Sequence, residues 1–395
     1  MDRKNLAILI PTLGRGGAER VVSNLSSYLA QKYNLFLVLN NSQVIEYPYE
    51  GQLIDLNTPA KGGIYKAINY IKRLHRVNKI KQKYEFDVSI SFLESSNIVN
   101  LFTRQKDKLI LSIRNHLPKG KKTFYGQLHK AFLLLFYNKA DVIVAVSEGI
   151  KKDLVDHFSI REDKIIVIYN PYDLDNINSL SQEALHDQHN HIFEHDVIIN
   201  VGRLSYQKGQ WHLIRAFRKV KAQHPHAKLV ILGEGKLKEY LHNLIVQLGL
   251  ENDVFLLGMQ DNPFKYIHHS KLFVLSSLFE GFPNALVEAI ACGTPVVAHD
   301  CRTGPREILA PGTDAFYQTA SIEYAEYGIL IPVCDGKQYK SHEPLTNEES
   351  IMAEAINGIL LNSEKRLYYQ NISTERAKDF SIHNLVNAWL ELIDN

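Results

Sequence analysis

The chain has 395 residues, of which 45% are hydrophobic and 22% charged, and its formal net charge is +2. This composition is typical of a soluble globular protein, and the length predicts two domains because it exceeds one ordinary core. No apolar stretch approaches the roughly 20 residues of a membrane-spanning helix, and the short apolar start, Leu6 to Ile10, does not predict a signal peptide.

Cysteine usage indicates the cellular compartment of the protein, and charge distribution indicates what its two halves bind. Cys292, Cys301 and Cys334 occur without a C-x-x-C pair, which indicates a reducing compartment and favours the cytoplasm. Residues 1 to 170 hold 26 Lys and Arg against 15 Asp and Glu, a net charge of +11, whereas the remainder holds 19 against 28, a net charge of −9. We expect the two halves to have different partners.

The first half alternates between buried strands and helices. Asn5 to Ile10 predicts a strand, and a glycine turn and an amphipathic helix follow it. Gly16 and Gly17 in this turn would let the backbone approach a ligand, although the spacing is not that of a dinucleotide loop and a tight turn without a ligand is the alternative. Further strands are predicted at 35–39, 87–92, 109–113, 141–146 and 164–168, with helices at 64–84 and 120–137.

The predicted helix from 64 to 84 is densely basic. Its apolar residues, among them Ile68, Ile71 and Leu74, recur at helical spacing and predict one packed face. A solvated basic surface is one interpretation, and contact with an anionic membrane is the other, since a second basic stretch, Lys119 to Lys130, lies beside the apolar run Phe132 to Tyr137. No recognised nucleic-acid module with interleaved aromatic residues is present, so we expect no nucleic-acid partner.

Arg114 and His116 directly follow the predicted strand 109–113. They would lie at the carboxyl end of that strand, where doubly wound folds bind their ligands. A structural role for the histidine is the alternative.

Residues 172 to 196 are polar and predict a linker between a first domain, 1–171, and a second, 197–383. The stretch carries four histidines, but no fixed spacing supports a metal site. Asp173 and Asp175 match the D-x-D pattern of metal-using sugar transferases, and we interpret the match as chance.

The second half repeats the strand and turn pattern, with strands predicted at 197–201, 228–232 and 254–257. Arg203 and Lys208 flank the turn after the first of these strands, where two cations could neutralise a diphosphate.

The stretch from 271 to 309 predicts a strand at 272–275, an elbow, a helix from Ala285 to Ala291 and another strand after Pro295. Pro283 is predicted at the first helical position. The helix N-terminus could hold an anionic group, and Glu288, one turn along, could accept hydrogen bonds from ribose hydroxyls. The alternatives are that Glu280 is a solvated loop acid and that Glu288 is a paired core acid.

The run Glu280-Gly-Phe-Pro-Asn-Ala-Leu-Val-Glu288 resembles the E-x7-E signature of retaining glycosyltransferases. With Gly293-Thr-Pro295 and Gly304-Pro-Arg-Glu-Ile behind it, the second half resembles glycosyltransferase family 4. The resemblance implies an α/β fold of the GT-B class, in which two doubly wound, Rossmann-like domains face a cleft. It implies an acceptor domain at 1–171, a donor domain at 197–383, and a C-terminal helix, about 384–395, that crosses back to the first domain.

The resemblance also implies an activity. We expect a retaining hexosyltransferase that moves a hexose or N-acetylhexosamine from a nucleotide diphosphate sugar, expected to be UDP-linked, to a glycan or lipid-linked acceptor in bacterial surface polysaccharide or glycolipid assembly. We expect no metal and no cofactor besides the nucleotide sugar, and a cytoplasmic enzyme that binds the inner face of the membrane peripherally. A hydrolysing UDP-sugar epimerase and a non-catalytic nucleotide-sugar-binding subunit are the alternatives.

The site residues follow from matching the family's motifs onto this sequence. The catalytic residues that the resemblance implies are Glu280, Arg203, Lys208 and His116. The donor-binding residues are Gly16, Gly17, Gly202, Gly258, Met259, Gly281, Phe282, Asn284, Ala285 and Glu288.

Overall fold

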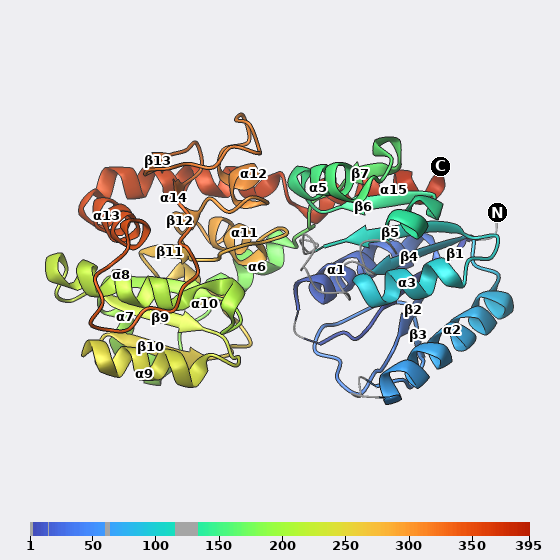
Figure 1. Cartoon of the computed structure of the whole chain (residues 1–395), viewed down its shortest axis with the longest axis horizontal. Helices are drawn as coiled ribbons and strands as arrows, with labels where there is room; N and C mark the ends of the chain where they lie inside the picture. Colours follow the sequence, from blue (N-terminus) through green and yellow to red (C-terminus); the bar gives the residue numbers. More distant parts are fainter. Residues whose placement is uncertain (1–2, 15, 60–63, 115–132) are drawn as a thin grey trace. The chain divides into compact units, whose positions relative to one another are not determined.

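The computed structural model describes residues 3–14, 16–59, 64–114 and 133–395. The chain forms two compact units, Met1–Tyr172 with Ser381–Asn395, and Asp173–Phe380. Each unit contains a seven-stranded sheet with helices between its strands (Figure 1). The predicted catalytic His116 and most of the helix predicted from 120 to 137 lie outside the described residues.

The sheet of the first unit is parallel, in the strand order β3-β2-β1-β4-β5-β6-β7. Its strands are β1 (Asn5–Ile10), β2 (Asn34–Leu39), β3 (Gln52–Asp55), β4 (Val88–Phe92), β5 (Lys108–Ile113), β6 (Val142–Ala145) and β7 (Ile165–Val167). Parallel neighbours need crossover connections, which helices supply. The helices between these strands include α1 (Gly17–Lys32), α2 (Ile64–Tyr84), α3 (Glu94–Phe102) and α5 (Glu148–Phe158).

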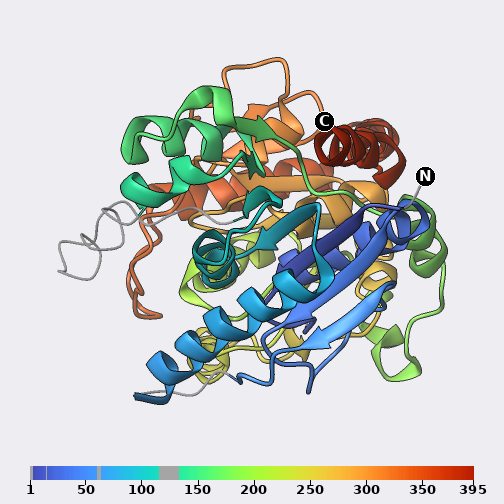
Figure 2. The ribbon, with the colours of Figure 1, turned by 90° about the vertical axis from the view of Figure 1, so that its right-hand side faces the viewer.

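Alternate residues of the central strand β1 contribute to two different cores. Leu6, Ile8 and Ile10 pack with residues of α1, whereas Ala7 and Leu9 pack with residues of α2 and α3. Figure 2 shows α2 lying across one face of this sheet. Because helices cover both faces, the strand must be apolar throughout, and this explains the continuous apolar run in the sequence.

The last helix, α15 (Ile382–Asp394), belongs to the first unit. Its buried Trp389 stacks on Phe92, with 5.9 Å between the ring centroids, in the same core as α1. At its end, the Asp394 carboxylate lies 2.6 Å from Lys32 Nζ. The predicted return of the C-terminal helix to the first domain is confirmed.

The second sheet has the order β10-β9-β8-β11-β12-β14-β13, and its edge strand β13 runs antiparallel to β14. Its strands are β8 (Val197–Val201), β9 (Lys228–Leu232), β10 (Val254–Gly258), β11 (Leu272–Leu275), β12 (Val296–His299), β13 (Glu323–Tyr324) and β14 (Ile329–Ile331). The helices of this unit include α8 (Gln210–Gln223), α9 (Lys238–Leu248), α10 (Phe264–His268), α11 (Asn284–Ala291), α12 (Pro305–Leu309), α13 (Asn347–Leu361) and α14 (Ser363–Lys378). The prediction of two doubly wound α/β domains is confirmed.

The predicted linker from 172 to 196 is wrong. These residues form α6 (Leu174–Ser181) and α7 (Asp187–Phe193), and nearly all of them belong to the second unit. Ile177 and Ile192 anchor the two helices in its interior. Helices this short bury few residues, so they leave little apolar periodicity in the sequence.

The predicted packed face of α2 is also partly wrong. Ile68 and Ile71 are 41% and 66% exposed. The buried side of the helix instead includes Val77 and, unexpectedly, Lys81, whose Nζ lies 2.6 Å from the carboxylate of the buried Asp107. The ion pair lets a lysine take a core position that apolar spacing assigned to other residues.

Candidate functional site

Three turns meet at the carboxyl edge of the second sheet. The backbone N–H of Gly202, after β8, donates to the carbonyl of Leu232, 2.9 Å away, and Gly233 donates to the carbonyl of Gly258 at 2.8 Å. These bonds place the ends of β8, β9 and β10 side by side. The predicted donor-binding residues Gly202, Gly258 and the 46% exposed Met259 therefore share one edge of the sheet.

Arg203 and Lys208 lie in the turn between β8 and α8. Arg203 is exposed, whereas the aliphatic part of Lys208 packs over Gly202. Gly209 ends this turn with φ +58°, and a Cβ there would come within 2.5 Å of the carbonyl oxygen of Ser276. Only glycine suits both the left-handed backbone and the close approach, so this residue fixes the turn against the loop after β11.

Lys208 and Glu280 form an ion pair. Lys208 Nζ lies 2.6 Å from Glu280 Oε1, and Gln207 Nε2 donates to the other carboxylate oxygen at 3.1 Å. Glu280 is 6% exposed. The interpretation of Glu280 as a solvated loop acid is therefore wrong, and two of the predicted catalytic side chains are in direct contact.

Buried polar side chains hold the backbone around this pair. The Ser276 hydroxyl donates to the Lys208 carbonyl at 2.8 Å, and the Thr303 hydroxyl donates to the Glu280 carbonyl. In the same loop region, His299 Nδ1 lies 3.1 Å from the Ser277 carbonyl oxygen, and burial lowers the pKa of this histidine to about 4. A neutral imidazole can donate from Nδ1 to that carbonyl, so His299 fixes the loop that carries Glu280.

Helix α11 begins directly after this loop, with Pro283 as its N-cap residue rather than its first helical residue. Gly304, with φ +95°, would bring a Cβ within 2.5 Å of Pro283 Cδ, so the Gly304-Pro-Arg-Glu-Ile segment packs closely on the start of the helix. Gly281 and Phe282 are buried, and Asn284 and Ala285 are half-buried. Glu288 is 4% exposed and lies one turn along.

The remaining predicted site residues belong to the first unit. Gly16 is the N-cap residue of α1, and Gly17 is the first residue of this helix. His116 lies outside the described residues. The roles of these three residues stay predictions, as do the roles of the predicted site residues in the second unit.

A metal site finds no support in the described ranges, which contain no group of three or more His, Cys, Asp or Glu side chains that could hold an ion. Asp173 of the D-x-D pattern has a structural role, because its carboxylate caps α6 by accepting from the backbone N–H of Asn176 at 3.0 Å. His189 hydrogen-bonds to the Tyr266 hydroxyl at 2.9 Å.

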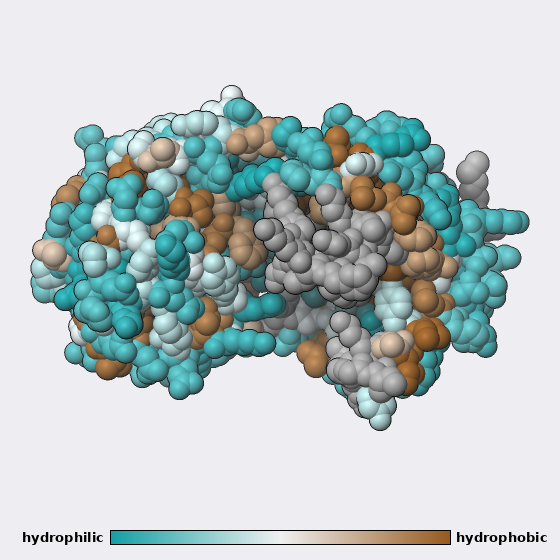
Figure 3. Space-filling view, in the orientation of Figure 1, coloured by the Kyte–Doolittle hydropathy of each residue, from teal (hydrophilic) through white to brown (hydrophobic). Residues whose placement is uncertain are grey.

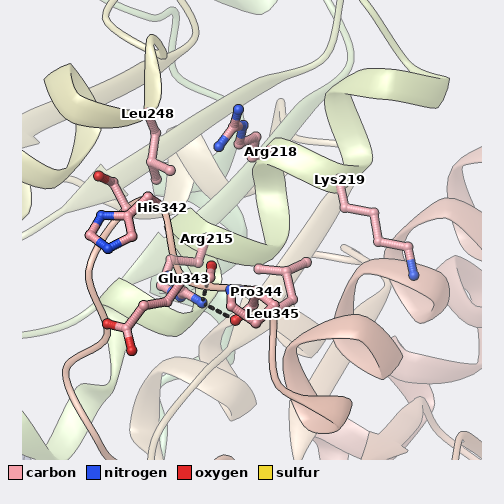
Figure 4. Close-up of a pocket in the computed structure, with 9 residues that line it drawn as sticks. Arg215, Arg218, Lys219, Leu248, His342, Glu343, Pro344 and Leu345 are labelled. Atoms are coloured by element: carbon pink, nitrogen blue, oxygen red, sulfur yellow. Dashed lines mark hydrogen bonds between the residues drawn. The ribbon is translucent and has the colours of Figure 1, made fainter.

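A cavity of about 390 Å³ lies elsewhere in this unit, between α8 and residues 341–345 (Figure 4). Its lining includes Arg215, Arg218 and His342 but none of the predicted site residues. Arg215 is already neutralised, since its Nε lies 2.9 Å from the Glu349 carboxylate and its other nitrogens donate to backbone carbonyls. This geometry indicates a structural role for Arg215, and the predicted catalytic residues Lys208 and Glu280 lie outside this cavity.

Sequence reasoning missed the residues that support the site. Gln207, Ser276, His299 and Thr303 belong to no catalytic motif, and their contacts join segments 22 to 73 residues apart. The one available signal was their position next to the motif residues at strand ends.

Comparisons with known proteins cover both halves of the chain. The family description "Glycosyl transferases group 1" matches residues 181–329, and "Glycosyltransferase Family 4" matches residues 15–176. Among solved structures, Anabaena HepE in complex with UDP and glucose has a TM-score of 0.76 at 20% identity and covers 100% of both chains. WaaG, a glycosyltransferase involved in lipopolysaccharide biosynthesis, has a TM-score of 0.71 at 14% identity and covers 98% of this chain and 99% of its own. The fold is therefore GT-B.

Two relatives match nearly the whole chain. An uncharacterised glycosyltransferase of Methanocaldococcus jannaschii is 36% identical over 357 residues, which cover 87% of this chain and 88% of the relative. The N-acetylgalactosamine-N,N'-diacetylbacillosaminyl-diphospho-undecaprenol 4-alpha-N-acetylgalactosaminyltransferase of Campylobacter jejuni is 33% identical over 384 residues, covering 95% and 96%. The chain belongs to glycosyltransferase family 4. Membership favours a transferase over the epimerase alternative.

Proposed function

We propose that the protein is a retaining glycosyltransferase that transfers a hexose or N-acetylhexosamine from a UDP-linked donor. The observation that carries this proposal is the gathering of Arg203, Lys208, Glu280 and α11 at one edge of the second sheet. A diphosphate needs cations and a helix N-terminus, and a sugar needs carboxylate acceptors for its hydroxyls. These groups are contributed by the turn after β8 and the elbow before α11.

Each residue then has a role. Lys208 and Arg203 would bind the diphosphate and offset the negative charge that develops as the sugar leaves. Glu288 would accept hydrogen bonds from the ribose hydroxyls, and Gly258 and Met259 would hold the base through the backbone. Glu280 would bind the donor sugar and stabilise its developing positive charge, besides orienting Lys208 through their 2.6 Å contact.

For the acceptor, we propose a lipid-linked glycan. The Campylobacter jejuni relative that matches 95% of the chain is named for a diphospho-undecaprenol acceptor. A second Campylobacter jejuni relative, 22% identical over 98% of the chain, is named for another diphosphate-linked undecaprenol glycan. An Escherichia coli relative, 25% identical over 78% of the chain, is a lipopolysaccharide 1,6-galactosyltransferase.

A panel of nucleotide sugars tests the donor. UDP-glucose, UDP-galactose and their N-acetylated forms are compared with GDP-mannose, and the preferred donor should raise the apparent melting temperature because it binds only the folded state. The preferred UDP-sugar should then give a transferred sugar of retained anomeric configuration when a lipid diphosphate glycan is added. No response to any UDP-sugar, or an inverted product, would contradict the proposal. Product formed without any acceptor glycan would favour an epimerase instead.

We further propose that transfer needs no metal ion, because Arg203 and Lys208 supply the positive charge. Treatment with EDTA, followed by assay with the preferred donor, is expected to leave turnover unchanged. Loss of activity that Mn²⁺ or Mg²⁺ restores would show that protein cations alone do not suffice.

The first unit is the proposed membrane-binding part. On α2, Tyr65, Ile68 and Ile71 are 62%, 41% and 66% exposed at helical spacing, and Figure 3 shows hydrophobic side chains over this helix. Lys72 and Lys79 belong to the same helix. Exposed apolar residues beside cations suit the interface of an anionic leaflet, where each cation contributes about 1 kcal/mol. No helix of the described ranges is long and apolar enough to cross a membrane.

Liposome flotation tests this surface. Binding to vesicles that contain anionic lipid is expected, with weaker binding at high salt, and Ile71→Glu is expected to reduce it severalfold. Leu361→Glu is the matched control, because Leu361 is similarly exposed, at 70%, but lies on α13 of the other unit. Equal binding to neutral and anionic vesicles, or an equal effect of both substitutions, would reject α2 as the membrane surface.

A further inference from the structure

Arg114 differs from the other buried cations of the chain. The described residues include five buried cations, and four of them have a carboxylate within 4.0 Å. These four pairs are Lys81 with Asp107, Arg215 with Glu349, Arg306 with Asp300 and Lys265 with Glu183. Arg114, 7% exposed, makes no ion pair with any described residue. A buried charge ordinarily requires an opposite charge, so this site calls for an anion from outside the chain.

The contacts of Arg114 orient its guanidinium without neutralising it. Its Nη2 donates to the Asn170 side-chain oxygen, its Nη1 lies 3.4 Å from the Ser112 hydroxyl, and the group lies over the Phe92 ring, 5.5 Å from the centroid. Burial lowers the pKa of Arg114 to about 9, so the group still carries its charge at neutral pH. A guanidinium has five N–H groups, and the described hydrogen-bond partners of Arg114, both neutral, use only two of them.

The surroundings of Arg114 in the fold are those of a binding edge. It follows the last residue of β5, and the Phe92 under it ends the neighbouring β4, so both lie at the carboxyl edge of the first sheet. Leu93, the next residue after β4, has φ +69°, a strained value for a leucine that is more common at functional sites. The sequence from 115 to 132 contains four lysines and neither Asp nor Glu, so it offers no counter-charge.

We propose that Arg114 binds a phosphate group of the acceptor, an inference that rests on the proposed transferase function. A guanidinium matches a phosphate with two parallel hydrogen bonds, and the residues assigned to the donor diphosphate belong to the other unit. The acceptor class is therefore a sugar linked through a phosphate or diphosphate, rather than a free glycan. Arg114 would select acceptors by this group and would have no part in the transfer step.

Inorganic pyrophosphate is the probe. The full-length protein is first saturated with UDP, which occupies the donor site, and pyrophosphate is then titrated by calorimetry. Wild type is expected to bind it, and Arg114→Gln is expected to bind at least about tenfold more weakly, the scale for losing one charged hydrogen bond. Arg104→Gln is the matched control, because Arg104 belongs to the same unit but is paired with Asp141, 2.7 Å away, at the opposite edge of the sheet. Equal binding by wild type and Arg114→Gln, or no binding by wild type, would overturn the proposal.

Two further arms separate the possible explanations. Two acceptors are compared that carry the same sugar, one linked to a diphosphate and the other to an uncharged aglycone. Arg114→Gln should raise KM for the diphosphate acceptor. It should leave KM for the uncharged acceptor and for the UDP-sugar unchanged. A raised KM for the UDP-sugar instead would assign the phosphate to the donor and reject the acceptor site. If Arg114→Gln fails to fold, Arg114→Lys is tested instead. Lysine keeps the positive charge but cannot form the two parallel hydrogen bonds of a guanidinium. Unchanged pyrophosphate affinity in Arg114→Lys would reject the proposal.

The outcome for Arg114 can be told apart from the outcome for the proposed function. UDP binding is measured first, and its absence in wild type would count against the transferase. Pyrophosphate binding is then measured in an Arg203→Ala/Lys208→Ala variant, in which the donor cations are removed, so the Arg114 site is still tested.

Discussion

Replacing Lys208 by alanine is expected to lower turnover by about 100-fold or more, the scale for losing one oriented group that stabilises developing charge. Lys208 is held over Gly202 by packing and points its ammonium at Glu280, 2.6 Å away. The substitution would remove the cation from the diphosphate and leave Glu280 buried without its partner. Steady-state kinetics with the preferred UDP-sugar measure the effect, and Arg203→Ala is expected to act in the same direction.

Lys221→Ala is the matched control for this substitution. Lys221 has a similar exposure, 16% against 19% for Lys208, and it is likewise paired with a carboxylate, that of Asp253 at 2.8 Å. Asp253 precedes β10, however, so this pair lies at the amino edge of the sheet. Comparable stability losses with a turnover loss confined to Lys208→Ala would support the diphosphate role. Normal turnover in both Arg203→Ala and Lys208→Ala would contradict the assignment of these two residues to the diphosphate.

Glu280→Gln and Glu288→Gln are expected to impair different steps, turnover in the first variant and donor binding in the second. If Glu288 holds the ribose in the ground and transition states alike, its substitution should weaken donor binding with little change in turnover. Glu280→Gln should lower turnover more than affinity, because the carboxylate would stabilise charge that develops only during transfer. Donor affinity by calorimetry and kcat by steady-state assay separate the two. Equal affinity losses with unchanged turnover in both variants would contradict these roles.

Because Lys208 and Glu280 are in contact, the effects of substituting them should also be measured together. Residues in direct contact are not expected to act additively, so the Lys208→Ala/Glu280→Gln variant should lose less activity than the product of the two single losses. Additive losses would mean that the observed ion pair has no part in catalysis.

The sequence by itself determined the architecture and was enough to predict where the donor site lies. Continuous apolar strands such as β1 and β11, alternating with helices, specify doubly wound sheets, because only a parallel sheet covered on both faces needs strands that are apolar throughout. The cations after β8 and the carboxylates around α11 could be assigned to one edge, since the carboxyl ends of parallel strands meet there.

The tertiary structure decided which of these groups touch and which residues face solvent. The contact of Lys208 with Glu280 spans 72 residues, so no local pattern encodes it. Apolar spacing favoured Ile68 and Ile71 as core residues of α2, but the core accommodates Lys81 in its ion pair with Asp107 and leaves the isoleucines exposed. The sequence placed Arg114 at a strand end, but only the fold shows that its side chain is buried and makes no ion pair with a described residue. The spacing of apolar residues in the sequence shows which residues could be buried. Ion pairs between residues far apart in the chain determine which charged groups are buried and with what partner.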